Sequence, residues 1–133
     1  MKLHHIGIVV KNIENSTKIM NKFIGNTTTK ILSNKTQKVN YCFINLGQTQ
    51  IELIEPTSDD SPIADFLNSH ENGYHHLAFE VNDIDESISK FVSNGSKLLA
   101  EPSIGFENRK IAFIFTRTLP VQLIELVSKK PMD

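Results

Sequence analysis

Two residue types that bind divalent metals recur at matched places along this chain. A His-His pair opens the apolar run at residues 3–10, and a second pair opens the apolar run at residues 74–81. Single glutamates, Glu52 and Glu125, stand in the middle of two further apolar stretches. Imidazole and carboxylate groups together suit Zn, Ni, Co, Mn or Fe(II). The spacing therefore indicates one metal site that is built twice from a histidine and a glutamate.

The alternation of side chains along a β-strand selects one histidine from each pair. In the first run the bulky residues Ile6 and Ile8 share one face, whereas His5 lies on the other face beside the small Gly7. The second run repeats this arrangement around His76. We expect the bulky faces to carry helices and the histidine faces to leave room for a cavity. The remaining histidines are expected to be structural or solvated: His4, His75 and His70.

Each glutamate lies between two large apolar residues of a predicted strand, so it projects away from them. A buried carboxylate that is charged and unpaired costs several kcal/mol, and burial is tolerated when the group is paired or binds a metal. Two imidazoles and two carboxylates leave two positions of an octahedron for further oxygen ligands. The predicted ligand set is His5, Glu52, His76 and Glu125.

The order of the predicted elements repeats along with the motif. The two histidines are 71 residues apart and the two glutamates are 73 apart, so the copies differ by only two inserted residues. The first copy is read as a strand at 3–10, a helix at 12–23 and strands at 27–32, 38–46 and 49–55, with a turn at 33–36. The second is read as a strand at 74–81, a helix at 84–93 and strands at 97–100, 109–116 and 121–127.

This order predicts an α+β fold made of two tandem βαβββ modules within one domain. The modules span about 1–56 and 74–128, and the segment 57–73 joins them with a short helix at 63–69. In the second helix, Ile84, Ile88, Phe91 and Val92 are expected to point inward. A chain of 133 residues buries about two-thirds of its unfolded surface, which is enough for a core and an internal site.

The amino-acid composition makes some classes of binding partner and location unexpected. The chain has 14 Lys and Arg against 15 Asp and Glu, scattered rather than grouped in a basic stripe, so nucleic acid is not an expected partner. No apolar run approaches the ~20 residues that span a bilayer, and the start lacks a secretory signal, so a cytoplasmic protein is expected. The single Cys42 lies in an apolar strand and is read as buried packing rather than as a nucleophile.

Two features of the second module each allow two interpretations from the sequence. The loop at 101–108 either closes over a ligand, with Gly105 as hinge and Phe106 as cover, or simply crosses the surface. Three cations near it either meet a substrate phosphate or carboxylate or, as is commoner at strand ends, are solvated: Arg109, Lys110 and Arg117.

The chain resembles the vicinal oxygen chelate superfamily, which includes glyoxalase I, methylmalonyl-CoA epimerase, extradiol dioxygenases and fosfomycin- and bleomycin-resistance proteins. The resemblance covers nearly the whole chain and is carried by HIGIVV (5–10), IELIEP (51–56), DSPIADFL (60–67), HHLAFEV (75–81) and LIEL (123–126). It implies paired βαβββ modules in a U-shaped mixed sheet around one divalent metal, Ni, Co, Zn or Mn, often in a homodimer. The implied ligands are His5, Glu52, His76 and Glu125.

The chemistry shared by these relatives is a stabilised enolate. The metal polarises a substrate oxygen, and a nearby glutamate removes the proton on the adjacent carbon. The resemblance assigns that base to Glu125, with Glu52 as its partner on the opposite face of the substrate. The pattern is most similar to methylmalonyl-CoA epimerase, which acts on an acyl thioester.

Three alternatives remain. The first is glyoxalase I (lactoylglutathione lyase)-like isomerisation of a hemithioacetal, since that enzyme has a similar ligand set. The second is a metal-free small-molecule-binding or resistance protein, and the third is a ring-cleaving dioxygenase, which uses two histidines and one carboxylate. The chain also departs from epimerases at Thr36-Gln37-Lys38, where they often read Glu-Gln-Gly, and at Phe115-Thr116-Arg117, where they read His-Pro-Lys.

Overall fold

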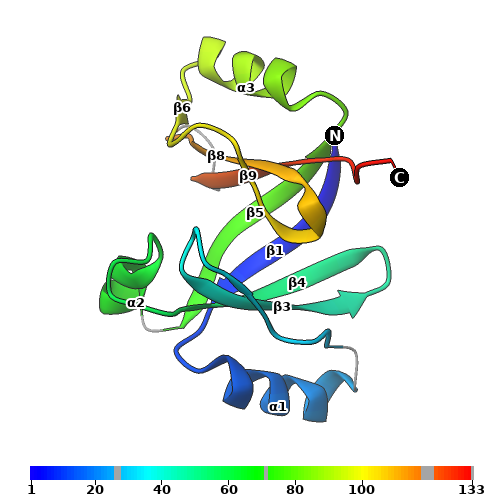
Figure 1. Cartoon of the computed structure of the whole chain (residues 1–133), viewed down its shortest axis with the longest axis vertical. Helices are drawn as coiled ribbons and strands as arrows, with labels where there is room; N and C mark the ends of the chain where they lie inside the picture. Colours follow the sequence, from blue (N-terminus) through cyan, green and yellow to red (C-terminus); the bar gives the residue numbers. More distant parts are fainter. Residues whose placement is uncertain (26–27, 71, 118–121, 133) are drawn as a thin grey trace. The chain divides into compact units, whose positions relative to one another are not determined.

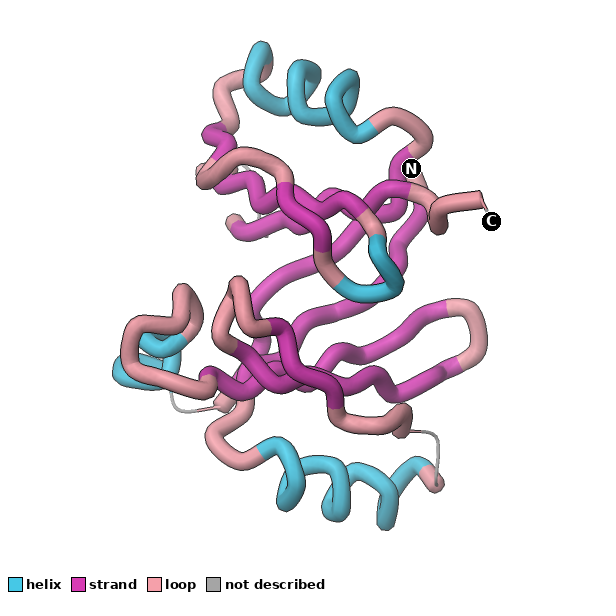
Figure 2. Tube along the Cα trace, viewed as in Figure 1, coloured by secondary structure: helices cyan, strands magenta, loops and turns pink. Residues whose placement is uncertain are grey.

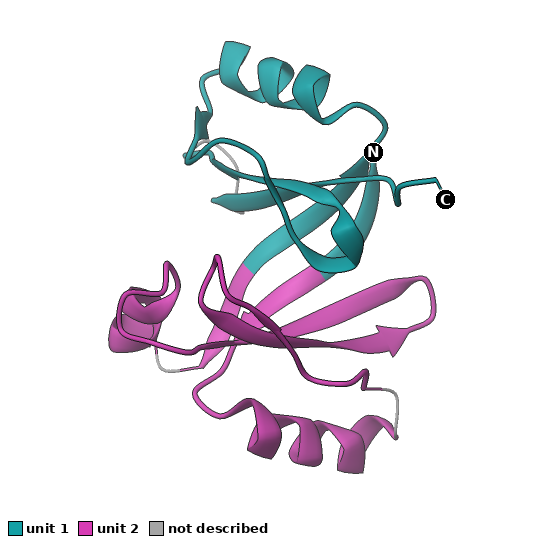
Figure 3. Cartoon of the chain, viewed as in Figure 1, with its two compact units in different colours: residues 1–5, 76–133 teal, residues 6–75 magenta. Residues whose placement is uncertain are grey.

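The chain forms two compact units in the computed structural model, which describes residues 1–25, 28–70, 72–117 and 122–132. One unit is Ile6–His75, and the other combines Met1–His5 with His76–Asp133 (Figures 1 and 3). Strands β1 (Lys2–Val9) and β5 (Gly73–Val81) each pass through both units. Figure 2 shows the helices and strands, and each unit marked in Figure 3 contains both, as the α+β prediction requires.

The unit Ile6–His75 places four strands side by side in the order β2-β3-β4-β1. Its further elements are α1 (Ile13–Ile24), β2 (Leu32–Asn34), β3 (Val39–Leu46), β4 (Thr49–Pro56) and α2 (Ala64–His70). Strands β3 and β4 form an antiparallel hairpin, and Gly47 supplies the positive φ of 68° in its turn. Strands that follow one another in the sequence therefore pair with each other, and β4 in addition pairs with β1.

Helix α1 covers one face of this sheet. Asn12 caps its start by accepting from the backbone N–H of Asn15, and Gly25 ends it with a φ of 82°. Ile13 of the helix packs with Leu53 of β4 in a core that also contains Val10, Cys42 and Ile44. Because side chains alternate, Glu52 lies on the opposite face of β4, which it shares with buried Ile54.

The other unit has strands in the order β1-β5-β9-β8-β6, with β7 paired to β8. Its further elements are α3 (Ile84–Ser93), β6 (Lys97–Leu98), β7 (Ser103–Ile104), a 3-10 turn (Phe106–Asn108), β8 (Lys110–Phe115) and β9 (Leu123–Ser128). Strand β9 is parallel to β5 and antiparallel to β8, so the sheet is mixed. The predicted fold class, α+β with a mixed sheet, is confirmed.

Helix α3 covers one face of this second sheet. Asp83 caps it by accepting from the backbone N–H of Glu86. Its Ile84 packs into a core with Val81, Ala112, Ile114, Ile124 and Leu126, against which Ile88 and Phe91 are partly buried. The prediction that Val92 points inward is wrong, because 46% of Val92 is exposed. Glu125, between Ile124 and Leu126, faces away from this helix.

Two predicted elements differ from the structure. The strand predicted at 27–32 lies instead at Leu32–Asn34, where the turn was expected, and the turn follows at 35–38. Pairing with β3 decides this position, because Leu32 and Asn34 stand opposite Tyr41 and Val39. The β-branched residue Thr28 makes only an isolated bridge, whereas Thr27 lies outside the described residues.

The segment predicted as a loop at 101–108 contains β7 and the 3-10 turn. None of the described helices is long and apolar enough to cross a membrane.

Candidate metal centre

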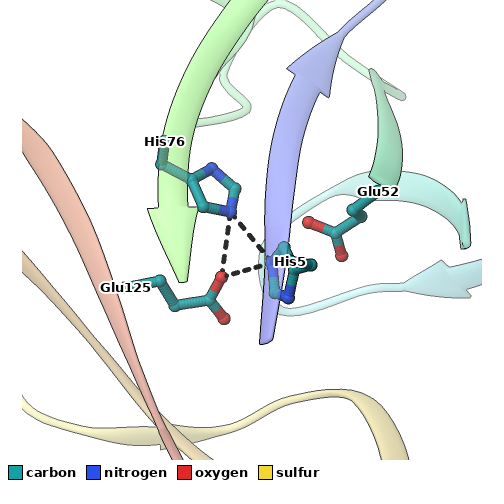
Figure 4. Close-up of side chains that lie close together, drawn as sticks. All are labelled: His5, Glu52, His76 and Glu125. Atoms are coloured by element: carbon teal, nitrogen blue, oxygen red, sulfur yellow. Dashed lines mark hydrogen bonds and ion pairs between the residues drawn. The ribbon is translucent and has the colours of Figure 1, made fainter. Parts of the chain in front are cut away.

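Three of the four predicted ligands converge within one unit, each from a different strand (Figure 4). His5 comes from β1, His76 from β5 and Glu125 from β9. The Nε2 atoms of the two histidines are 3.1 Å apart, and each lies 3.0 Å from Glu125 Oε2. Both histidines are 0% exposed and Glu125 is 3% exposed. Three ligand atoms thus meet at one buried point.

Strand register explains why this point has room for them. Glu125 stands opposite Ala78 of β5 on one side and opposite Phe113 of β8 on the other. Ala78 is small, so it leaves space beside His76 on the same face of β5. The Phe113 ring meets the His76 ring edge-on, with centroids 5.6 Å apart, and thereby limits its rotation.

The spacing of the three atoms fits a divalent metal. Ligand atoms on neighbouring corners of an octahedron with bonds of about 2.1 Å are about 3.0 Å apart, whereas tetrahedral ligands are about 3.4 Å apart. The observed separations of 3.0–3.1 Å match one triangular face of an octahedron. The donor set and its spacing therefore fit a divalent metal ion.

Glu125 is ionised at neutral pH despite its burial. Burial alone would raise its pKa, but hydrogen bonds and charge interactions with His5 and His76 outweigh that effect and lower the pKa. A buried carboxylate that keeps its charge needs a cation or two good donors beside it. In this structure the two imidazoles provide those donors, and a metal ion would provide the cation.

Glu52, the fourth predicted ligand, belongs to the other unit. It lies in β4 opposite Phe43 of β3 and is 8% exposed. Cys42, next to Phe43, is also buried, and burial together with the Glu52 charge raises its thiol pKa to about 11. Cys42 is thus a packing residue as predicted, since so little of it is thiolate at neutral pH.

Arg109 is buried beside the site rather than solvated at a strand end. Only 2% of it is exposed, its Nε donates to the Ser128 carbonyl at 2.8 Å, and its guanidinium forms an ion pair with Glu80. The expectation of a solvated charge is therefore wrong for Arg109. It holds for the other two cations: Lys110 makes an exposed ion pair with Asp85, and Arg117 is exposed.

His4, which is predicted to be structural, lies directly beside the candidate site. Its Nδ1 lies 2.8 Å from His5 Nδ1, and its Nε2 lies 3.2 Å from Arg109 Nη1. Burial, reinforced by His5 and Arg109, lowers the His4 pKa to about 4, so the ring is neutral at pH 7. His4 therefore connects the buried arginine to a candidate ligand.

Phe106 shields this histidine pair. It is buried, and its ring centroid lies 5.3 Å from that of His4 and 5.7 Å from that of His5. Gly105, the predicted hinge, has an ordinary φ of −116° in this structure. A Cβ on Gly105 would lie 2.8 Å from Ile111 Cδ1, so a larger residue there would have to displace the end of the Ile111 side chain.

The remaining histidines lie around α2. His70 ends that helix, is exposed as expected for a solvated residue, and stacks on the Phe66 ring with centroids 4.2 Å apart. His75 meets the same ring edge-on at 5.3 Å. Both contacts fit structural roles in the unit Ile6–His75.

Comparisons with known proteins assign the family. The family model described as the glyoxalase/bleomycin resistance protein/dioxygenase superfamily matches residues 4–113. The chain belongs to this superfamily.

Individual relatives of this superfamily member include proteins of known and unknown activity. An uncharacterised protein, YqjC of Bacillus subtilis, is 34% identical over 97% of this chain and 93% of its own length. The ethylmalonyl-CoA/methylmalonyl-CoA epimerase of Cereibacter sphaeroides is 30% identical over 94% of this chain and 96% of its own. A solved methylmalonyl-CoA epimerase in complex with methylmalonyl-CoA and ammonium superposes with a TM-score of 0.87, at 25% identity, covering 98% of each chain.

The residues that sequence reasoning missed lie on the ligand face of the sheet. Glu80 follows His76 and Ala78 at alternate positions of β5, so strand alternation predicts that it lies on the same face as His76. Its partner Arg109 precedes β8, and no local signal distinguishes a buried arginine from a solvated one. The candidate metal centre is therefore bordered by charged and aromatic side chains: Glu80, Arg109 and Phe106.

Proposed function

We propose that this superfamily member is a divalent-metal-dependent enzyme of the methylmalonyl-CoA epimerase type. It would remove the proton from the carbon next to a thioester carbonyl and return a proton there. The observation that carries the proposal is the convergence of His5, His76 and Glu125 on one buried point at octahedral spacing. The epimerase relatives, one of them solved with methylmalonyl-CoA, supply the substrate class.

Glu52 completes the ligand set in this proposal. It matches Glu125 in the internal repeat, lies on the face of β4 away from α1 and is buried. In this proposal it joins His5, His76 and Glu125 as the fourth ligand of one metal ion. Two histidines and two glutamates would hold one Ni, Co, Zn or Mn ion.

The metal, when bound, would stabilise the negative charge that develops on the substrate oxygen. Glu125 is ionised and so is able to accept the substrate proton. Glu52, at the matching repeat position, would serve the opposite face of the substrate carbon. Phe106 and Phe113 pack against the histidine rings and limit access of water to this side of the site.

Isomerisation of a hemithioacetal, as in lactoylglutathione lyase, is the second candidate. The observation that favours it is the turn at residues 35–38, where Thr36 and Lys38 replace the glutamate and glycine typical of epimerases. Lys38 adopts a φ of 55°, so the glycine-like backbone is retained although the side chains differ. A substrate that reached this segment would therefore meet different side chains from those of an epimerase.

Solvent deuterium exchange separates these possibilities. Protein stripped by a chelator is reloaded with Co, Ni, Zn or Mn and mixed with methylmalonyl-CoA in D2O, and loss of the α-proton signal is followed by NMR. We expect exchange that disappears on chelation and returns with metal. Turnover of methylglyoxal–thiol hemithioacetals without thioester exchange would support the second candidate. Tight ligand binding by stripped protein without any turnover would contradict both.

A further inference from the structure

The sheet face that carries Glu125 differs in exposure on the two sides of that residue. This face lies opposite the core that packs under α3. On one side of Glu125, Ile111 is 3% exposed and Val127 is 0% exposed. On the other side, Phe115 and Leu123 are only partly buried. Within the described part of this unit, a ligand that approaches Glu125 along the sheet therefore meets more exposed surface on the side of Leu123.

Strand register places two apolar residues and one cation side by side on this more exposed side. Phe115 of β8 stands opposite Leu123 of β9 and, on its other side, opposite Lys97 of β6. Because side chains alternate along a strand, all three share the face of Glu125. We call them the row Lys97-Phe115-Leu123. Strand β6 is the last strand of the sheet, so the row ends in a positive charge at the sheet edge.

The other end of the row adjoins the candidate ligand His76. Leu77 of β5 stands opposite Ile124 of β9 in a parallel pairing, so continuing the register by one residue brings His76 next to Leu123. Neighbouring strands are about 4.8 Å apart, so the three steps from β5 through β9 and β8 to β6 span about 14 Å. The row therefore connects the candidate metal centre with a cation about 14 Å away.

Lys97 is available to an anionic ligand. It is exposed, and no ion pair joins it to a described carboxylate. Two other lysines of this unit do form ion pairs, Lys110 with Asp85 and Lys130 with Glu107. A lysine ammonium is a compact charge on a flexible stem and commonly binds phosphate groups. An anionic group that arrives along the row would therefore meet Lys97.

We propose that the row Lys97-Phe115-Leu123 binds the arm of a coenzyme A thioester, and that Lys97 is a specificity-determining residue that contacts its diphosphate. The pantetheine arm between sulfur and diphosphate is as long as about four residues of extended chain, or about 14 Å. This length matches the three strand spacings of the row. The arm is uncharged and carries methyl and methylene groups, whereas the diphosphate is anionic, so the chemistry of the ligand follows that of the row. The inference rests on the proposed function, which supplies the thioester.

Calorimetric titration with coenzyme A and with pantetheine, which has the same arm without phosphates, tests the inference without any turnover. Lys97→Gln should weaken coenzyme A binding about threefold to fivefold, the upper part of the range for an exposed ion pair. The affinity for pantetheine should stay the same. At about 1 M salt, where screening shortens the range of charge interactions to about 3 Å, wild type and variant should bind coenzyme A equally.

Three further variants complete this experiment. Lys97→Arg keeps the charge and should bind coenzyme A as tightly as wild type. Lys90→Gln makes the same change at an exposed lysine of α3, which packs on the opposite face of the sheet, and should leave the affinity unchanged. Phe115→Ala should weaken both coenzyme A and pantetheine about threefold or more, because an apolar contact with the arm is lost. The Lys97 variants change only an exposed edge position, so they decide the test if Phe115→Ala does not fold.

Equal affinity of wild type and Lys97→Gln for coenzyme A at low salt would overturn the inference. An equal loss of affinity for coenzyme A and for pantetheine would also overturn it, because Lys97 would then not act on the phosphates. Coenzyme A binding that depends on Lys97, in a protein that exchanges no α-proton of methylmalonyl-CoA, would instead contradict the proposed function.

Discussion

Replacing Glu125 with glutamine is expected to lower the rate of metal-dependent α-proton exchange at least about a thousandfold, within the range that loss of a general base produces. The carboxylate is buried, ionised and within 3.0 Å of both histidines, so the change removes both the proposed base and one charged ligand. Glutamine has the same shape, and its carbonyl oxygen still accepts a hydrogen bond from one imidazole. Exchange is measured by NMR in D2O at saturating metal.

The matched control is Glu101→Gln, which makes the same chemical change at an exposed glutamate outside the site. It should leave the exchange rate within about twofold of wild type, as surface substitutions usually do. Thermal unfolding of all three proteins separates a lost catalytic group from a lost fold. A folded Glu125→Gln protein that exchanges at the wild-type rate would remove Glu125 from the mechanism.

Replacing His76 with alanine is expected to weaken divalent-metal binding at least about a thousandfold, because it deletes a proposed ligand. Mutation of residues that only hydrogen-bond to a metal ligand already lowers metal affinity about 10–100-fold. His76 is fully buried, and its Nε2 points at the shared oxygen of Glu125. The cavity left by the ring also exposes Phe113 and Glu125 to water. Calorimetric titration of the stripped protein with zinc measures the change.

The neighbouring histidine gives the control for this experiment. His75 lies on the same strand but on its other face and contacts Phe66. His75→Ala should therefore keep metal affinity within a few-fold of wild type while it lowers thermal stability. Equal losses of affinity in the two variants would mean that the strand, rather than the ligand, was disrupted.

The predicted site follows from two regularities of the sequence pattern. Strand alternation places His5 and His76 on the faces opposite the helices, and the internal repeat links Glu125 to Glu52. Neither regularity depends on how distant segments pack. That is why the convergence of the candidate ligands within one unit, His5, His76 and Glu125, is predictable from the sequence alone.

The surroundings of the site depend on contacts that a single sequence does not encode locally. Arg109 is buried because Glu80, the Ser128 carbonyl and His4 satisfy its donors, and these partners come from three different strands. Strand β2 exists because β3 offers it partners, although its residues Leu32-Ser33-Asn34 favour a turn. Gly105 packs closely against the Ile111 side chain six residues away. In each case tertiary packing overrides local preference.

The central claim is that one octahedral divalent metal is held at the point where His5, His76 and Glu125 converge. Anomalous diffraction from crystals of the cobalt-loaded protein tests it most directly. We predict one strong peak per chain about 2.1 Å from the Nε2 atoms of His5 and His76 and from a Glu125 oxygen. A Glu52 oxygen should lie at the same distance. A metal-loaded crystal with no peak at this point, or with its peak elsewhere in the chain, would contradict the account.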